Sequence, residues 1–402
     1  MALMPVAEAL QRVLADASAL PGEWVPLNET LGRVLTENVT ALRTQPPAAV
    51  SAMDGYAVRA SDVATVPVTL KVIGEVAAGH PFPGQVGGGQ AARIFTGGVM
   101  PIGSDTVVIQ ELATLSGDLV TIQKPTAKNR NVRAQGIDFA QDQVLLHKGR
   151  RLTDRDLMLA AAMNHPALCV HRRPKVAVLG TGDELVPPGS TPGPGEVVYS
   201  NGYALSAMAR SEGAEVHDLG IASDSIEDIV SAVRGARKWN ADILVTSGGA
   251  SVGEHDLVQR ALAAEGLDLS FWRVALRPGR PMMHGRLGGM QVLGVPGNPV
   301  SSFVCAFLFL VPLIRRLAGR QDVERIPQSA RLGCDLPAND ERADYLRATL
   351  EAGAGGPVAT PLPDQDSSLM APLAKADCLL IRAPHAPAAA KGSDCVILKL
   401  SL

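Results

Sequence analysis

The most informative segment of this chain is Asp242-Ile243-Leu244-Val245-Thr246-Ser247-Gly248-Gly249-Ala250-Ser251-Val252-Gly253-Glu254-His255-Asp256. An apolar run leads into a glycine-rich turn, and a helical pattern follows from Leu257. Glycines let a backbone approach an oxyanion closely, and a helix N-terminus offers unpaired N–H groups with about half a positive charge. Glu254 and Asp256 would repel a bare phosphate, so we expect a hard divalent cation to bridge them. The stretch therefore predicts a metal-assisted phosphate or phosphoanhydride site.

Length and composition exclude several classes of protein. At 402 residues the chain is expected to hold more than one core, because single cores stop growing at about 250–300 residues. A formal net charge of −3 argues against a nucleic-acid or membrane-surface partner. The five cysteines form no CxxC pair, which argues against a zinc ribbon or a disulfide framework. The start lacks a signal-peptide pattern, and the apolar run 303–314 is too short to span a bilayer. We expect a cytoplasmic protein.

The spacing of apolar residues changes several times along the chain between helical and strand patterns, which predicts several domains. Helical patterns flank a segment of short β-type runs, and strands that alternate with helices follow from Lys175. After about Asp322 the chain returns to short strands, which suits a small β-barrel. The expected domains are a split helical domain (1–43 and 142–174), an inserted β domain (44–141), an α/β domain (175–322) and a C-terminal β-barrel domain (323–402).

The alternation in the α/β domain predicts a doubly wound parallel sheet with helices on both faces. Ligands bind at the carboxyl ends of the strands in such a sheet. Unusual loops follow three of the expected strands, at Gly180–Glu184, Ser247–Asp256 and Pro296–Pro299. We expect these loops to converge on one crevice.

Each of these features also has an ordinary structural interpretation. Asp183 or Glu184 suits a plain turn, and Asp224 with Glu227 stands at capping-box spacing before a helix. The loop 296–299 suits a simple helix entry with Ser301 as the cap. Arg277-Pro278-Gly279-Arg280-Pro281 places two guanidiniums three residues apart between stiff prolines, which predicts an oxyanion clamp, although a solvated basic loop has the same pattern.

A serine hydrolase is an alternative of another class. Gly249-Ala250-Ser251-Val252-Gly253 matches the G-x-S-x-G nucleophile elbow, and Asp256 or Asp268 with His284 would complete a triad. The acidic residues that follow interrupt the helix start that an elbow requires. We therefore favour the phosphate site, and the two interpretations predict opposite effects of replacing Ser251 and Asp256.

Six motifs taken together resemble a known family. The chain resembles the molybdopterin molybdenumtransferases, which are the bacterial MoeA proteins and the gephyrin E domain, over nearly its whole length. The resemblance implies an elongated, MoeA-like multidomain α/β plus β subunit whose α/β domain binds molybdopterin. It also implies a homodimer in which the partner subunit completes the crevice. The motifs, in family order and spacing, are Ser51–Ala57, Ile94–Asp105, Thr181–Leu185, Ser247–Asp256, Arg277–Pro281 and Pro296–Val300.

The resemblance implies roles for particular residues. Glu184, Asp224 and Asp256 match acidic positions that serve the metal and the adenylylated pterin. Asp54 and Thr96 match active-site positions of the β domain that reach the partner's crevice. Arg277 and Arg280 match the basic loop that handles molybdate. The implied substrate-binding residues are Asn201, Ser247, Gly248, Gly249, Ser251, Gly253, Pro296, Gly297, Asn298 and Pro299, with Arg347 and Ser367 aligning more loosely.

The implied reaction inserts molybdate into adenylylated molybdopterin and releases AMP with the help of Mg²⁺. The dithiolene of the pterin supplies the soft sulfurs that hold molybdenum, so no protein cysteine is required. A non-catalytic molybdopterin carrier or chaperone of the same fold is the alternative. The preceding adenylyltransferase and the recipient molybdoenzymes are expected partners.

The chain departs from the family pattern at a few positions. Arg277 and Arg280 stand where the family usually has lysine, and Tyr199 stands where an aspartate is common. Gly98 replaces a usual alanine. These differences leave open whether tungstate competes with molybdate and which molybdoenzyme receives the product.

Overall fold

The computed structural model describes residues 3–248, 257–353 and 355–400. The chain divides into two compact units. The first contains Met1–Glu23, Gly32–Thr36 and Val170–Leu402, and the second contains Trp24–Leu31 and Glu37–Cys169. Strands β1 (Gly22–Pro26) and β12 (Ala167–His171) lie at the points in the sequence where the units divide.

A six-stranded sheet forms the centre of the α/β part of the first unit. The expected parallel pairing holds for its first four strands, whereas β20 (Met283–Leu287) pairs antiparallel with both β21 (Met290–Val295) and β18 (Asp268–Trp272). The doubly wound sheet expected from the sequence is confirmed, but its parallel pairing ends at this edge, where a two-glycine turn at Gly288 and Gly289 joins β20 to β21 as a hairpin. In spatial order the strands are β16 (Glu215–Ala222), β13 (Lys175–Thr181), β17 (Ile243–Ser247), β21 (Met290–Val295), β20 (Met283–Leu287) and β18 (Asp268–Trp272).

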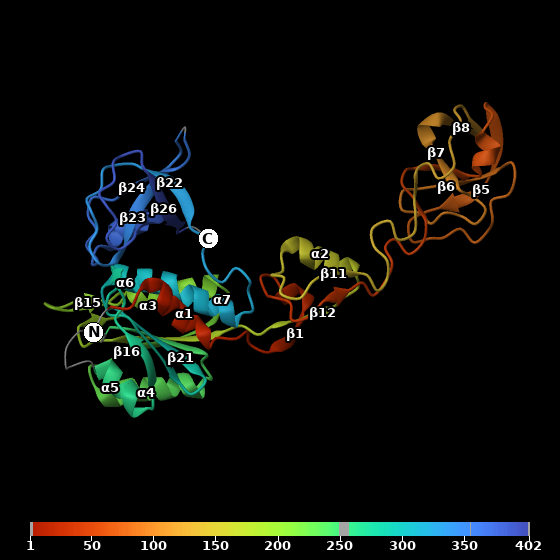
Figure 1. Ribbon diagram of the computed structural model, residues 1–402. Helices are drawn as coiled ribbons and strands as arrows, with labels where there is room; N and C mark the ends of the chain where they lie inside the picture. The colour runs from red at the N-terminus through yellow and green to blue at the C-terminus, as the bar shows by residue number, and fades with distance from the viewer. Residues whose placement is uncertain (1–2, 249–256, 354, 401–402) are drawn as a thin grey trace. The chain divides into compact units, whose positions relative to one another are not determined.

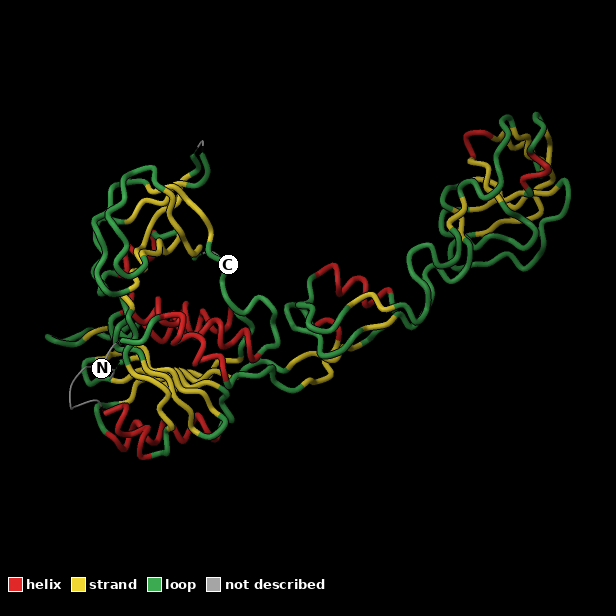
Figure 2. Tube along the Cα trace, viewed as in Figure 1, coloured by secondary structure: helices red, strands yellow, loops and turns green. Residues whose placement is uncertain are grey.

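Helices cover both faces of this sheet, as Figures 1 and 2 show. Alternate residues of β13 point to opposite faces, so Val176 and Val178 join one core while Ala177 and Leu179 join the other. The second core is closed by α4 (Ile226–Lys238) and α5 (Leu257–Ala264). The first core is closed by α1 (Val6–Ala15), α3 (Asn201–Ser211), α6 (Pro299–Cys305), η4 (Ala306–Leu310) and α7 (Val311–Leu317).

Residues 299–317 form a continuous helical stretch that is long and apolar enough to cross a bilayer by length and composition. However, 89% of its most apolar window is buried inside the protein. A core helix passes the same test, and the packing of its leucines and phenylalanines against the sheet explains its composition.

The N-terminal helix differs from the expected domain division. We expected residues 1–43 to belong to the split helical domain, but α1 lies in the first unit. Its buried residues Ala9 and Val13 share a core with Leu313 and Leu317 of α7. The apolar face of α1 therefore completes the α/β core.

The C-terminal part of the first unit is a closed five-stranded barrel. β25 (Cys378–Arg382) pairs with both β26 (Asp394–Lys399) and β23 (Ala343–Glu351), and these pairings close a ring of five strands. Strand β19 (Leu276–Arg277) adds to β23 in parallel. The barrel strands are β22 (Gln328–Leu332), β23 (Ala343–Glu351), β24 (Val358–Pro361), β25 (Cys378–Arg382) and β26 (Asp394–Lys399), and α8 (Met370–Lys375) follows β24.

The second unit contains a six-stranded sheet with its own two small cores. Near its ends β2 (Val39–Thr40) pairs with β11 (Val144–Leu146), which joins the segments before and after the β region. β3 (Val50–Ser51) pairs with β10 (Val132–Arg133), and α2 (Asp154–Ala162) begins at a capping box made by Thr153 and Asp156. The sheet, in spatial order, is β7 (Thr106–Ile109), β4 (Gly55–Val58), β6 (Gln90–Ile94), β5 (Val68–Val76), β9 (Leu119–Ile122) and β8 (Ala113–Ser116), with short helical turns η1 (Leu27–Glu29), η2 (Ala60–Val63) and η3 (Gln110–Leu112).

Candidate active site

A cavity of about 360 Å³ lies at the carboxyl ends of the parallel strands of the first unit. Gly180 of β13 is in register with Ser247 of β17, which is in register with Val295 of β21. The loops that follow these strands therefore start at one level. The cavity is lined by Thr181, Glu184, Leu185, Val197, Val198, Tyr199, Ser200, Asn201, Ser247, Gly248, Gly297, Asn298, Pro299, Ser368 and Met370.

Asn201, the first residue of α3, links two of these loops. Its side-chain amide donates to the Ser247 hydroxyl and to the Gly297 carbonyl, each at 2.8 Å. Ser247 is almost fully buried, so this bond pairs a hydroxyl that has little access to water. The structure thus brings together three residues that the sequence assigned to substrate binding.

Gly248 is required by the backbone. It has φ of +100°, and a Cβ at this position would lie 2.3 Å from the Thr181 carbonyl oxygen. Only glycine fits a left-handed conformation with so close a neighbouring strand end. The close approach packs the β17 turn against the end of β13 at the cavity wall.

The acidic residues lie on two adjoining loops. Glu184 lines the cavity, and it is the single acidic residue among the described lining residues. Asp224 does not line the cavity; its backbone N–H donates to Asp183 Oδ1 at 2.9 Å, and the Asp183 N–H donates to Asp224 Oδ2 at 3.4 Å. These reciprocal bonds tie the loop after β13 to the loop after β16.

The interpretation of Asp224 as a helix cap is wrong. Helix α4 begins at Ile226, and Ser225 is its N-cap, with the Ser225 hydroxyl accepting from the Asp228 N–H. The hydroxyl of Ser225 also donates to Glu227 at 3.0 Å. The helix thus starts one residue later than the capping-box spacing indicated, which leaves the Asp224 carboxylate for the loop.

The 296–299 loop both lines the cavity and begins helix α6. Helix α6 begins at Pro299 with Asn298 as its N-cap, so Ser301 lies inside the helix and is not the cap. Gly297, Asn298 and Pro299 line the cavity, whereas Pro296 is buried behind them. The Asn298 side-chain amide donates to the Ser367 hydroxyl at 2.8 Å, and Ser367 itself is not among the lining residues.

Arg347 does not reach the cavity. It is 1% exposed, and its guanidinium donates to the carbonyls of Leu369 at 2.9 Å and Asp364 at 3.1 Å. Burial lowers the pKa of Arg347, with Asp364 and Asp366 opposing the shift. The arginine expected to bind substrate instead holds the loop 364–369, from which Ser368 faces the cavity.

The two arginines of the basic loop differ in their partners. The guanidinium of Arg277 forms a two-point ion pair with Asp344, through Nε at 2.6 Å and Nη2 at 2.7 Å. Arg277 also contacts Asp340 at 3.1 Å and Asn339 at 3.0 Å, and the hydrogen bond to Asp344 raises the pKa of Arg277. Because β19 pairs beside β23, Arg277 lies against these carboxylates, and its ion pairs partly neutralise the charge that it could offer an oxyanion.

Arg280 has a different environment. It is exposed, and within the described part of the chain its side chain makes no hydrogen bond or ion pair. Neither Arg280 nor Arg277 lines the strand-end cavity.

Asp54 and Thr96 form a pair in the second unit. The backbone N–H and the hydroxyl of Thr96 both donate to Asp54 Oδ1 at 2.7 Å. These bonds, helped by the charge of Arg93, hold the pKa of Asp54 below its ordinary value. The sequence placed both residues at an active site, and the structure places them in direct contact.

An apolar wall of the cavity was not predicted from the sequence. Leu185 and Val186 of β14 pair with Val197 and Val198 of β15, and Met370 of α8 adds a side chain from the C-terminal part. Tyr199 is 5% exposed, and burial raises the pKa of its phenol. Glycines 180 and 202 make room for its ring, because a Cβ at either would lie within 2.5 Å of it. An aromatic ring thus occupies the position where an acid was expected.

Four predicted site residues, Gly249, Ser251, Gly253 and Asp256, lie outside the described residues. The histidine of the hydrolase alternative is described. His284 is 3% exposed, and its Nε2 pairs with Gln291 Oε1 at 2.9 Å inside the sheet. Burial lowers the pKa of His284. A buried imidazole whose Nε2 is engaged by Gln291 does not suit a general base.

Comparison with family models covers most of the chain. Residues 4–164 match the MoeA N-terminal region (domain I and II), and residues 177–316 match a probable molybdopterin binding domain. Residues 329–400 match the MoeA C-terminal region (domain IV).

Curated relatives and a solved structure agree with these models. The chain is 34% identical to the molybdopterin molybdenumtransferase of Haemophilus influenzae over 89% of each chain. It is 33% identical to that of Bacillus subtilis, over 94% of this chain and 90% of the relative. The crystal structure of a molybdopterin biosynthesis MoeA protein from Pyrococcus horikosii matches with a TM-score of 0.86 and 31% identity, covering 100% of both chains.

Proposed function

Because this chain belongs to the MoeA family of molybdopterin molybdenumtransferases and acts in molybdenum cofactor biosynthesis, we propose that it inserts molybdate into adenylylated molybdopterin and releases AMP. The observation that carries this proposal is the strand-end cavity, which Glu184, Asn201, Ser247 and Gly248 line together. A cavity of about 360 Å³ falls within the usual range for a small-molecule ligand.

The donor set of the cavity suits Mg²⁺. Carboxylate and hydroxyl oxygens are the ligands of hard cations, and Glu184, Ser200 and Ser247 are among the lining residues. In the described part of the chain no three acidic, histidine or cysteine side chains gather as a metal site. Mg²⁺ commonly binds through one or two carboxylates and takes further oxygens from substrate phosphates. We therefore assign Glu184 to a cation held jointly with the phosphoanhydride, and the family resemblance adds Asp224 and Asp256 as its further proposed ligands.

The protein's own residues divide the remaining tasks. Asn201 fixes the positions of the Ser247 and Gly297 loops, so the cavity keeps its shape before the pterin binds. Exposed Arg280 supplies positive charge for the incoming oxyanion, while Arg277 holds the loop through Asp344. The metal, when bound, polarises the phosphoanhydride.

An AMP-release assay tests the reaction. Purified protein is mixed with adenylylated molybdopterin, molybdate and Mg²⁺, and AMP is measured by chromatography. We expect AMP release that requires both Mg²⁺ and molybdate, falls by about 100-fold in Glu184→Gln, and is unchanged in the matched exposed variant Glu351→Gln. A carrier or chaperone would bind the pterin and release no AMP. Repeating the assay with tungstate measures the preference for the oxyanion.

We also propose a cytoplasmic homodimer in which Asp54 and Thr96 of one subunit complete the cavity of the other. Two inactive variants, Asp54→Asn and Glu184→Gln, are mixed after unfolding and refolding together. Restored AMP release supports shared sites, because a mixed dimer contains one site with both residues intact. If the mixture stays inactive while mixed dimers are present, the shared site is wrong.

A further inference from the structure

Tyr199 lies where three elements beside the strand-end cavity meet. It follows β15, and its backbone N–H donates to the Val186 carbonyl of β14 at 2.8 Å. Its side chain is 5% exposed and lies against Gly180 of β13 and Gly202 of α3. Asn201, which links two loops of the cavity, comes only two residues later in the chain. The ring of Tyr199 thus stands between the end of a strand and the start of a helix.

This ring accounts for the glycines at positions 180 and 202. A Cβ on Gly202 would lie 2.0 Å from the Tyr199 hydroxyl oxygen, and a Cβ on Gly180 would lie 2.5 Å from Cε2 of the ring. Neither glycine has a positive φ, so the backbone at these positions suits other residues. Glycine within a helix or a strand is less favourable than alanine. The space that the ring occupies is therefore what requires both glycines.

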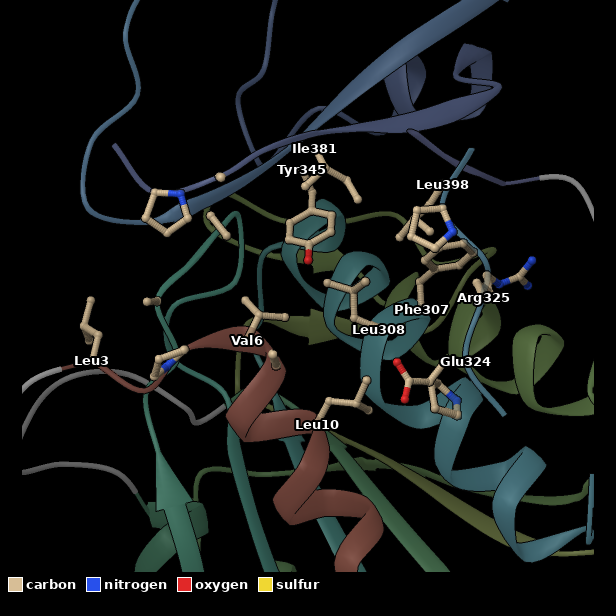
Figure 3. A pocket seen from close by; sticks show the side chains of 18 of the residues that line it. Leu3, Val6, Leu10, Phe307, Leu308, Glu324, Arg325, Tyr345, Ile381 and Leu398 are labelled. Atoms are coloured by element: carbon tan, nitrogen blue, oxygen red, sulfur yellow. The ribbon is translucent and has the colours of Figure 1, made fainter. Parts of the chain in front are cut away.

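The other mostly buried tyrosine of the first unit has a different setting. Tyr345 of β23 is 8% exposed and lines a separate cavity of about 620 Å³, where Figure 3 shows it across from Leu308 of η4. That cavity shares no lining residue with the strand-end cavity. The Tyr345 ring borders a cavity, whereas the Tyr199 ring fills the space between two elements.

A spacer between β13 and α3 sets where α3 begins. Asn201 is the first residue of α3, and its amide reaches the Ser247 hydroxyl and the Gly297 carbonyl at 2.8 Å each. Hydrogen bonds between nitrogen and oxygen are formed at about 2.7–3.2 Å, so a shift of the helix start by about 1 Å would weaken both bonds. Within the described part of the chain the Tyr199 hydroxyl has no hydrogen-bond partner, which leaves the ring as the part that acts.

We propose that Tyr199 is a positioning residue for the strand-end cavity. Its ring, fitted between Gly180 and Gly202, holds the start of α3 so that Asn201 joins the two loops before the substrate binds. This inference rests on the proposed pterin site, and it adds a residue that acts through Asn201 rather than on the reacting atoms.

Affinity for adenylylated molybdopterin tests the role of the ring. Binding is measured without molybdate and without oxygen, through the fluorescence of the pterin, so no turnover is needed. We expect Tyr199→Ala to raise Kd about 10-fold, because two hydrogen bonds of Asn201 are weakened. Tyr199→Phe keeps the spacer and should change Kd less than about 2-fold. Phe271→Ala is the matched control, because Phe271 is also 5% exposed but belongs to the edge strand β18, and its Kd should equal that of the wild type.

Gly202→Ala tests the fit between the ring and the helix. In the wild type the new Cβ meets the ring, so the substitution should lower the melting temperature by about 3 °C or more and raise Kd about 10-fold. In Tyr199→Ala that space is empty and alanine favours the helix, so the same substitution should raise the melting temperature. A reversal of sign between the two backgrounds shows direct coupling of the two positions.

Three results would overturn the proposal. They are a folded Tyr199→Ala whose Kd stays within about 2-fold of the wild type, a Tyr199→Phe that binds as weakly as Tyr199→Ala, or an equal effect of Gly202→Ala on the melting temperature in both backgrounds. If Tyr199→Ala does not fold, Tyr199→Leu takes its place in each comparison. Failure of the proposed function gives a different result, because a wild type that binds the pterin without releasing AMP keeps the expected order of Kd values.

Discussion

Arg277 and Asp344 are joined through two parallel hydrogen bonds, at 2.6 and 2.7 Å, between neighbouring strands that belong to different parts of the first unit. The pair fixes the loop 277–281 to the barrel. It also separates the tasks of two arginines that look equivalent in the sequence, because Arg280 is exposed.

Replacing each arginine by lysine tests this separation. A lysine keeps the charge but cannot make the two-point contact, so Arg277→Lys should lower stability by about 1 kcal/mol. Arg280→Lys should change it by less than about 0.5 kcal/mol. The midpoint of urea unfolding measures both changes. Equal effects of the two substitutions would contradict a structural role that is specific to Arg277.

Gly248→Ala should damage the cavity. The new Cβ would lie 2.3 Å from the Thr181 carbonyl oxygen at a φ of +100°, so we expect a loss of more than about 2 kcal/mol. Thermal unfolding followed by circular dichroism measures the loss. Gly289→Ala is the control, because a Cβ there meets no atom within 4 Å. A melting temperature equal to that of the control would show that the turn can rearrange.

Asn201→Ala should weaken binding of the pterin more than it slows chemistry. The substitution removes both hydrogen bonds that join α3 to the Ser247 and Gly297 loops, so the preformed shape of the cavity is lost. We expect KM for adenylylated molybdopterin to rise about 10-fold in the AMP-release assay, with a smaller change in kcat. Asn38→Ala, which removes an amide that binds the Lys148 N–H in the second unit, should leave both constants unchanged.

Thr96→Val should raise the pKa of Asp54. The hydroxyl of Thr96 favours the charged carboxylate, so its loss moves the pKa upward toward the ordinary value of 3.8. The sign follows from linkage. A lowered folded pKa stabilises the fold above the unfolded pKa, and this contribution is lost as the pH falls through the folded pKa. Carboxyl NMR titration measures the shift, and Thr114→Val, on an exposed strand position, should leave Asp54 unaffected.

Asp256→Ala and Ser251→Ala separate the transferase from a serine hydrolase. We expect Asp256→Ala to abolish AMP release, because the cation would lose a ligand, and Ser251→Ala only to weaken it. The hydrolase interpretation requires the reverse order, measured with ester substrates. Activity that survives in Asp256→Ala but not in Ser251→Ala would remove Asp256 from the metal site.

Local patterns predicted much of the fold. The short strands expected within 44–141 include β5, and the helices expected to alternate with strands after Lys175 include α4. The spacing of apolar residues and the positions of turn residues can be read from the sequence, and their alternation between strand and helix patterns predicted the sheet. The antiparallel edge of β20 and β18 was missed because short, glycine-bounded apolar runs do not report their direction.

The candidate site was predicted in part. The strand-end loops meet at one cavity because parallel strands in register end at one level. The ion pair of Arg277 with Asp344 was not predicted, since the two residues are 67 positions apart and nothing local couples them. The contribution of Met370 to the wall was missed for the same reason, because it depends on how the C-terminal part packs.

The ring of five barrel strands has one consequence for the behaviour of the chain at high concentration. A sheet with a free border can recruit a strand from a neighbouring molecule, and this is a route to aggregation. In the ring, β25 meets β23 on one side and β26 on the other, so its borders are already occupied. A chain that ends before Asp394 would lack β26, and the edges of β22 and β25 that pair with it would be exposed. We expect such a truncated barrel to aggregate through these open strand edges.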